Sequence, residues 1–383
     1  MSDPTTAVTL RQMTELYNVA HERPYSILFA NYSWALGIAG GLALLWVISA
    51  WRGDRGRVER FALPLAVAFI IGGFVNVLSE VEQPGRLFHG YIYGWSNWDT
   101  AIIKYGIILL PLFLLLSWWL SFQTMPREAL DAEIGRLPAP WRQLANFFSF
   151  GSGRYSLFDN PPFARVVLVA MAAVGLFAPL YSAVFLMNEH GVPVWNSPAE
   201  PLLYLSSAIG IAATLMLVAV PALGWLATGR WEATCAAYRW TAVIALAVCA
   251  VVWFGWMAWI ALFGSAEALR AASLFAGPYA GPIFWNWTII GLVVPLVALV
   301  TPLGRMKLAQ VVACLGALWG GYTIRAVVLL GGEALNRSGA GYLNLRIGAG
   351  ATWSSGVAVL LFIGFLAALL AATPRGPAPS AKA

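Results

Sequence analysis

Long apolar segments recur along this chain of 383 residues and decide what it can fold into. Each has about 20 mostly apolar residues, the length at which an α-helix crosses a hydrocarbon core of ~30 Å. Hydrophobic residues make up 60% of the sequence and charged residues 10%, whereas a soluble domain has about a quarter charged residues. In lipid, a helix satisfies all its own backbone hydrogen bonds. The sequence therefore predicts an all-α, polytopic integral membrane helix bundle.

About nine transmembrane helices are expected. They are predicted at residues 26–51, 61–80, 98–121, 163–187, 201–228, 238–264, 282–303, 308–331 and 352–373. This divides the chain into an N-terminal segment (1–24), a single transmembrane domain (25–373) and a C-terminal tail (374–383). The stretch 122–162 between spans is predicted to be an amphipathic segment on the membrane surface. Residues 1–24 have no apolar stretch typical of a removable signal peptide.

Lysine and arginine are distributed unevenly between the two sides of the predicted bundle. Fifteen of the 23 lie in or within three residues of the C-terminal tail and the loops after spans one, three, five and seven, six lie on the other side, and two lie deeper within spans. The positive-inside rule then places the N-terminus outside, with the loop 122–162 and the C-terminus in the cytoplasm. This asymmetry accounts for the net charge of +6, so no nucleic-acid partner is expected.

The cysteines and histidines argue against a redox metal in this chain. The three cysteines stand singly, whereas iron–sulfur clusters need grouped thiolates; they are Cys235, Cys249 and Cys314. The three histidines lie outside the predicted spans, whereas a transmembrane haem needs histidines inside facing helices; they are His21, His89 and His190. We expect no iron–sulfur cluster, no haem and no other metal.

Pairs of small residues at helical spacing occur in two of the predicted spans. Gly37 and Gly41 lie in the first, and Gly316 and Gly320 lie in the eighth. Small residues four apart let two helices approach closely, so we predict packing contacts here rather than ligand contacts.

Ionisable residues of the spans gather near the predicted outer ends. They are Glu80, Glu82, Lys104 and Arg325. A charge in hydrocarbon costs several kcal/mol unless it is paired or lines a cavity. We therefore expect the four to lie at similar depth around one polar pocket, which Asn18, His21 and Tyr181 also reach. The structural alternative is a set of ion pairs joining Glu80 or Glu82 to Lys104 or Arg325.

Several short motifs recur in a recognisable order between residues 15 and 335. They are Tyr17-Asn18-Val19-Ala20-His21, Glu82-Gln83-Pro84-Gly85-Arg86, Leu180-Tyr181-Ser182 followed by Val194-Trp195-Asn196-Ser197-Pro198, Gly277-Pro278 with Pro282-Ile283-Phe284-Trp285, and Gly320-Gly321-Tyr322-Thr323-Ile324-Arg325. In order and spacing they resemble the signatures of the NrfD-type family, the membrane subunits related to that of polysulfide reductase.

The resemblance implies a quinone-binding membrane anchor of a respiratory oxidoreductase complex. Its cofactor would be menaquinone or ubiquinone, held by Asn18, His21 and Tyr181, with Arg86 also contributing. Its partners would be a four-cluster ferredoxin-like iron–sulfur subunit and a large molybdopterin catalytic subunit. These would lie on the outer face of a bacterial or archaeal cytoplasmic membrane. The chain alone would not act on the terminal substrate.

A mechanism follows from the chemistry of these side chains. The imidazole of His21 can give or take a proton at neutral pH, and the phenol of Tyr181 can donate to the opposite quinone oxygen. Glu80, Glu82, Lys104 and Arg325 would relay protons or set the potential of the site.

The sequence also departs from the family pattern. Ser182 replaces a common glycine, and a ninth span is predicted. These departures leave the terminal reaction open, with the ninth span favouring the tetrathionate, arsenate or sulfite branches over polysulfide. A secondary transporter with an off-centre polar site, and a purely structural membrane anchor, are the alternative functions.

Overall fold

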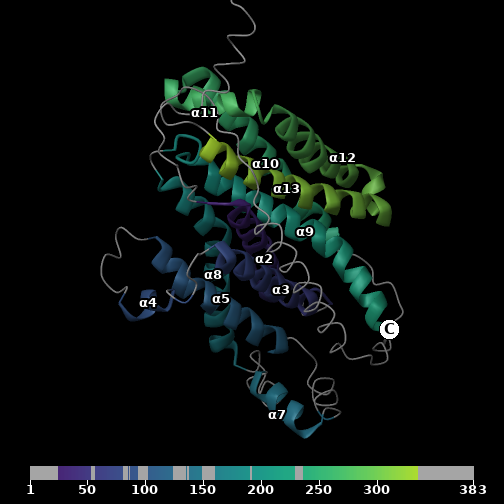
Figure 1. Cartoon of the computed structure of the whole chain (residues 1–383). Coiled ribbons are helices and arrows are strands. Elements are labelled where there is room, and N and C mark those ends of the chain that lie inside the picture. The colour runs from purple at the N-terminus through teal and green to yellow at the C-terminus, as the bar shows by residue number, and fades with distance from the viewer. Residues whose placement is uncertain are drawn as a thin grey trace, which may run out of the picture.

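The computed structural model of the protein describes residues 25–52, 57–80, 85, 87–93, 102–123, 135, 138–148, 160–189, 192–228 and 236–334. No strand occurs in these ranges, and eight of the helices in them are long and apolar enough to cross a membrane. The predicted all-α membrane bundle is therefore confirmed (Figure 1). The predicted ninth span, 352–373, lies outside the described residues, as does the segment 1–24.

The long helices follow the predicted order. They are α2 (Ile27–Trp51), α3 (Arg57–Glu80), α5 (Ile103–Gln123), α8 (Pro161–Met187), α9 (Ala199–Thr228), α10 (Ala236–Phe263), the π-helix η3 (Pro282–Val293) continued by α12 (Val294–Val300), and α13 (Lys307–Ala334). The short helices are α4 (Leu87–Ile92), α7 (Ala139–Phe148), α11 (Ala266–Ala276) and the 3-10 helix η4 (Pro302–Arg305).

Polar side chains cap the starts of several helices. The Ser26 hydroxyl accepts from the Leu28 N–H (3.1 Å) at α2, and the Ser265 hydroxyl accepts from the Ala268 N–H (3.2 Å) at α11. At α8 the Asn160 side chain accepts from the Phe163 N–H (3.3 Å), and proline fills the first helical position. Each cap satisfies a donor that the first helical turn leaves without an intrahelical partner.

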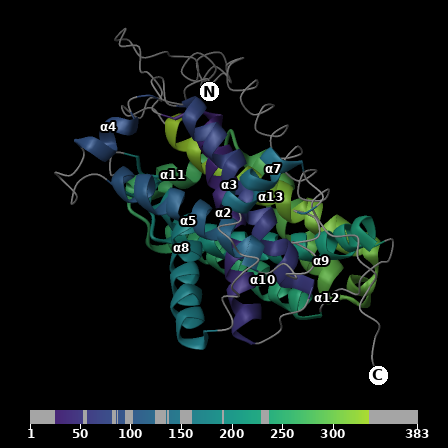
Figure 2. The ribbon, with the colours of Figure 1, turned by 90° about the horizontal axis from the view of Figure 1, so that it is seen from below.

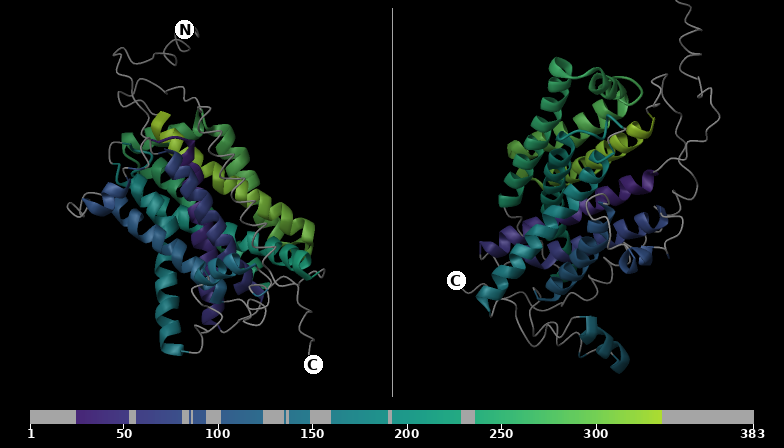
Figure 3. Two further views of the ribbon diagram at one scale, coloured as in Figure 1. Left: turned by 60° about the horizontal axis from the view of Figure 1, so that its bottom comes forward. Right: turned by 90° about the vertical axis from the view of Figure 1, so that its left-hand side faces the viewer.

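The short helices lie at the edge of the bundle. Figure 2 shows α4 beside the start of α5, where the Tyr91 hydroxyl donates to the Ile107 carbonyl at 2.6 Å. The helix α7 lies within the stretch 122–162, but its position on the membrane surface stays a prediction. In the left view of Figure 3, the first turns of α8 project from the other helices. Apolar side chains there and along α10 are exposed, as expected for lipid-facing surfaces.

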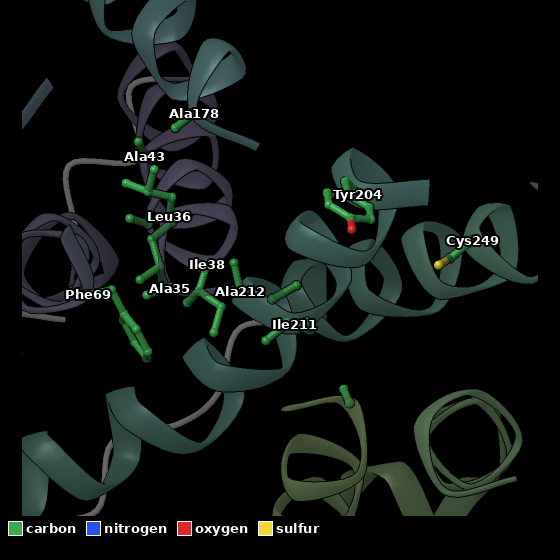
Figure 4. Packing of buried hydrophobic residues seen from close by; sticks show 14 of the residues in the cluster. Ala35, Leu36, Ile38, Ala43, Phe69, Ala178, Tyr204, Ile211, Ala212 and Cys249 are labelled. Carbon is green, nitrogen blue, oxygen red and sulfur yellow. The ribbon is translucent and has the colours of Figure 1, made fainter. Parts of the chain in front are cut away.

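Helix α2 lies at the centre of the bundle and packs against α3, α8, α9 and α13. Most of its residues are buried, and Leu36, Ile38 and Trp46 are fully enclosed. Figure 4 shows Ile38 directed towards Ile211 and Ala212 of α9. A helix that is apolar on all sides is expected at such a central position.

Small residues let the helix backbones approach closely. A Cβ atom added to Gly41 would collide with the Ala208 carbonyl of α9, and one added to Gly316 would collide with the Ile290 carbonyl of η3. Gly320 lies directly against Gly291 in the same way. The predicted packing role of these glycines is confirmed at all three positions, whereas Gly37 faces a side chain described below.

Contacts along α2 give the relative depth of the other helices. Ser26, at its start, contacts Glu80 of α3; Ser33 bonds Ser182 of α8 (3.0 Å); and Gly37 faces Arg325 of α13. The end of the bundle where α2, α5 and α9 begin and α3, α8 and α13 end is called the Glu80 end here.

Basic residues concentrate at the opposite end of the bundle. Those near helix ends there are Arg52, Arg165, Arg239, Arg305 and Lys307. This distribution agrees with a cytoplasmic location for that end under the positive-inside rule. The orientation itself stays a prediction.

Candidate functional site

Two carboxylates hold the residues just before α2. Both the backbone N–H and the hydroxyl of Ser26 donate to the carboxylate of Glu80, the last residue of α3. The backbone N–H of Tyr25 donates to Glu333 Oε1 near the end of α13 (2.8 Å). Helices α3 and α13 thus fix the point at which the N-terminal segment enters the bundle.

The Tyr25 side chain packs in an aromatic corner at the Glu80 end. Its ring centroid lies 5.0 Å from that of Phe29, 5.7 Å from Phe185 and 5.8 Å from Trp195. Burial, with smaller contributions from Glu189 and Glu333, raises the pKa of Tyr25 to about 12. Its phenol therefore stays protonated at neutral pH and can donate a hydrogen bond.

Tyr181, the predicted quinone ligand on α8, adjoins the same corner. Its side chain is buried, and its ring lies 6.1 Å from Phe185, which also contacts Tyr25. The Tyr181 hydroxyl faces Gly106 of α5 so closely that a Cβ atom at Gly106 would collide with it. Tyr181 therefore lies where α5, α8 and the start of α2 meet.

Ser182, the predicted departure from the family pattern, has a packing role. Its hydroxyl accepts from the Ser33 hydroxyl at 3.0 Å and lies 3.4 Å from the Pro179 carbonyl. The serine joins α2 to α8 at the residue that follows Tyr181.

Lys104 lies nearer the helix end than expected. Helix α5 begins at Ile103, so Lys104 is in its first turn, whereas the span predicted at 98–121 put it six residues inside. Gly106, the neighbour of Tyr181, follows two residues later. Lys104 thus lies at the Glu80 end of the bundle, as Tyr181 does.

The prediction that Arg325 shares this depth is wrong. Arg325 faces Gly37, eleven residues beyond Ser26, which is about 16 Å along α2 at 1.5 Å per residue. Its guanidinium donates to the carbonyls of Gly321 (2.8 Å) and Tyr204 (3.1 Å) and lies over the Tyr204 ring, 4.7 Å from the centroid. The ion pair considered between Arg325 and Glu80 is therefore not formed. The long Arg325 side chain finds its partners on α9 and its own helix instead.

Sequence reasoning missed two buried polar features. Asn31 Nδ2 donates to Asn76 Oδ1 (3.0 Å) between α2 and α3, and Asn76 donates on to the Gly72 carbonyl (2.8 Å). Glu200, in the first turn of α9, is fully buried. The sequence placed Glu200 in a loop because the predicted span began one residue later.

The remaining predicted site residues lie outside the described ranges. They are Asn18, His21, Glu82 and Arg86. Along the chain, His21 precedes Tyr25 by four residues and Glu82 follows Glu80 by two. Their predicted roles stay predictions.

The described residues hold no group of three or more histidine, cysteine or acidic side chains placed to bind a metal. Cys249 and Cys314 are buried, free thiols in α10 and α13. Cys235 and two of the three histidines lie outside the described ranges.

Comparison with known protein families gives a match over most of the chain. The family model described as Polysulphide reductase, NrfD matches residues 15–335, a range that includes every described helix and the positions of Asn18 and His21. No curated protein matched the sequence.

Proposed function

This chain belongs to the NrfD, or polysulphide reductase, family, and from that premise we propose that it exchanges electrons between a membrane quinone and an iron–sulfur partner subunit. Family membership makes it a multi-pass membrane subunit of a polysulphide reductase-like complex.

The observation that carries the proposal is the shared corner of Tyr25 and Tyr181. Tyr181 and the N-terminal segment are far apart in sequence, yet Tyr25 and Tyr181 contact the same Phe185 ring. His21 and Asn18 precede Tyr25 by only four and seven residues. The hydrogen bonds of Glu80 and Glu333 hold Ser26 and Tyr25 in this corner, which supports the proposal that Asn18 and His21 bind the ring there.

The side chains around Tyr181 suit a quinone ring. Such a ring is flat and apolar and needs a hydrogen-bond partner at each oxygen. Phe177 and Phe185 offer aromatic faces at centroid distances of 5.1 and 6.1 Å from Tyr181, and the phenol can donate to one oxygen. His21 would hydrogen-bond the other oxygen of the quinone. Asn18 would orient His21 or the ring.

When bound, the quinone supplies two-electron chemistry coupled to two protons. His21 would hold or release a proton at neutral pH, because the imidazole titrates in that range. Tyr181 would keep its phenol proton and fix the orientation of the ring. Glu80 would position the N-terminal segment through Ser26, and Lys104 would add positive charge at the same end. Glu82 and Arg86 keep the relay and ring-binding roles predicted for them.

The partners are proposed to lie at the Glu80 end, on the outer face of the bacterial or archaeal cytoplasmic membrane. Tyr181 is six residues from the end of α8, which is about 9 Å along the axis. A ring held at this depth would lie close to a docked four-cluster iron–sulfur subunit. A large molybdopterin subunit beyond it would carry the terminal reaction.

The test uses the complex in its native membrane. Mild detergent extraction should recover an iron–sulfur subunit and a large molybdopterin subunit with this chain. In the same membranes, His21→Ala and Tyr181→Phe should strongly reduce quinol-linked turnover while co-purification of the partners is unchanged. Tyr322→Phe is the matched control, because Tyr322 packs on Trp34 and Trp319, away from Tyr181.

Two results would contradict the proposal. Full quinol-linked activity in both His21→Ala and Tyr181→Phe would remove the ring from this corner. A chain that co-purifies with no redox subunit in several mild detergents would favour a transporter instead.

A further inference from the structure

Glu200 is a carboxyl group enclosed inside the bundle. Its exposure is 0%, and neither carboxylate oxygen has a hydrogen-bond partner among the described residues. It lies in the first turn of α9, where its backbone N–H donates to the carbonyl of the buried Ser197 (3.2 Å).

Glu200 does not cap the start of α9, which is the ordinary role of an acid at this position. Ser197 and Glu200 have the Ser-x-x-Glu spacing of a capping box, in which the glutamate accepts from the serine N–H. Here the Ser197 N–H donates to the Trp195 carbonyl (2.8 Å) instead, and the Ser197 hydroxyl accepts from the Ala199 N–H (3.3 Å). The Glu200 carboxyl is therefore released from the helix start and buried in the interior.

A buried carboxylate without partners is strongly unfavourable, so Glu200 should hold its proton unless a positive charge is near. Tyr204 is one turn further along α9 on the same face. The guanidinium of Arg325 lies over the Tyr204 ring at 4.7 Å and donates to the Tyr204 carbonyl (3.1 Å). Tyr204 thus follows Glu200 by one helical turn and contacts the guanidinium of Arg325.

Arg325 supplies a charge that does not titrate. Guanidinium groups stay protonated in proteins. Arg325 is 1% exposed, and its Nε has no partner among the described residues. Its two other nitrogens donate to neutral carbonyls rather than to a carboxylate, so these bonds leave its charge unbalanced. Glu200 is the nearest acid along α9, and ionising it would provide that balance.

The charge balance proposed for Glu200 and Arg325 also depends on the other titratable groups near this part of α9. Cys249 of α10 approaches the Leu203 carbonyl (3.8 Å) and, as Figure 4 shows, lies on the helix next to Tyr204. Helix α2 meets α9 through Gly37 and Gly41, which have no titratable side chain. At the Glu80 end, Glu80 of α3 accepts from Ser26 and Glu333 of α13 accepts from the Tyr25 N–H. On α8, Tyr181 lies at the quinone corner, and Arg165 lies in the first turns, at the opposite end of the bundle.

We propose that Glu200 is a site inside the membrane that binds and releases a proton. When the proton is bound the site is loaded; when it is released, the fixed positive charge of Arg325 balances the carboxylate. In the loaded state the carboxyl is neutral and Arg325 carries the net charge. In the unloaded state the proton leaves past Ser197 at the Glu80 end, and the carboxylate and guanidinium balance each other across Tyr204. The site is separate from the proposed quinone corner and does not depend on it.

The experiment measures protonation of Glu200 directly. A hydrophobic carbodiimide, dicyclohexylcarbodiimide, modifies carboxyl groups that are protonated in apolar surroundings. Native membranes containing the whole complex are treated across a pH series, and the Glu200 peptide is quantified by mass spectrometry. Modification should be high at acid pH and fall as the pH rises. Glu200→Gln is the blank, and Glu80, held by Ser26, is the internal comparison.

A charge variant tests the role of Arg325. Arg325→Gln removes the cation that favours the carboxylate, so half-modification should move to higher pH by about one unit or more. Arg325→Lys keeps the charge and should move it less.

Two outcomes would overturn the proposal. In wild type, which needs no variant to fold, modification of Glu200 that is absent at every pH or constant across the series would exclude a titrating site. An unshifted pH profile in Arg325→Gln would exclude the pairing with Arg325. Since the readout needs no quinone, it is independent of the outcome for the quinone corner.

Discussion

Replacing Glu80 distinguishes two roles for an acid at the entrance of the bundle. If Glu80 relays protons, Glu80→Gln and Glu80→Ala should be equally harmful, because neither side chain titrates. If Glu80 positions the N-terminal segment, only the alanine should be severe. Glutamine keeps an oxygen that can accept from the Ser26 N–H or hydroxyl, whereas alanine leaves both donors without this partner. The structure favours the positioning role.

The magnitude follows from the two bonds. A hydrogen bond to a charged group contributes about 1.5–3 kcal/mol and a neutral one about 0.5–1.5 kcal/mol. Alanine should therefore cost about 3 kcal/mol of anchoring, or roughly a hundredfold in occupancy of the anchored state. Glutamine should cost about 1 kcal/mol, or roughly fivefold.

The assay is quinol-linked turnover of the complex in native membranes, measured as kcat and KM for a soluble quinol. We expect Glu80→Ala to raise KM and lower kcat/KM by up to two orders of magnitude, with Glu80→Gln close to wild type. Glu333→Gln is a parallel control, because Glu333 accepts from the neighbouring Tyr25 N–H. Equal, severe loss in Glu80→Gln and Glu80→Ala, with kcat falling and KM unchanged, would refute the positioning argument and restore the proton relay.

Three further predictions concern single residues. Gly106→Ala places a methyl group against the Tyr181 hydroxyl and should reduce quinol-linked activity about tenfold with normal membrane insertion; Gly255→Ala, which meets nothing within 4 Å, should have no effect. Because the pKa of Tyr25 is raised to about 12, its folded form keeps a proton that the unfolded chain loses near pH 10. Stability should be unaffected below about pH 10 and fall between there and pH 12, and Tyr25→Phe should lose less over that range in alkaline unfolding measurements. Arg239 donates to the carbonyls of Leu299 (2.5 Å), Val300 (3.2 Å) and Thr301 (2.9 Å) at the end of α12, so Arg239→Ala should lower the thermal midpoint clearly and Arg239→Lys by less.

The fold class could be predicted because hydrocarbon length is a strong constraint. A run of about 20 apolar residues has few alternatives to a membrane helix, whatever its neighbours are. The eight spans in the described ranges follow the predicted order. Helix ends were less accurate, as at α5, because the polar residues near an interface can belong to the loop or to the first turn.

The depth of Arg325 could not be predicted in this way. The sequence gives its distance from the helix end, but not the neighbouring helix that its long side chain reaches. The backbone carbonyl of Tyr204, which accepts from it, has no signature in sequence. Glu200 was missed because the predicted span began one residue after it, and its Ser-x-x-Glu spacing is also that of an ordinary helix cap. Only the geometry shows that the cap is not made.

Gly37 explains how a central apolar helix can tolerate a cation at its middle. A Cβ atom at this position would lie 2.8 Å from Nη2 of Arg325, so the absence of a side chain makes room for the guanidinium against α2. The neighbouring Gly41 instead makes room for the backbone of α9. Two glycines that look equivalent in sequence thus serve different purposes, one for packing and one for a buried charge. Because Arg325 lies about 16 Å along α2 from Ser26 and Glu80, the polar groups of this bundle form two separate sets. One set holds Tyr25 and Ser26 just before α2, and the other surrounds the guanidinium of Arg325 inside the bundle.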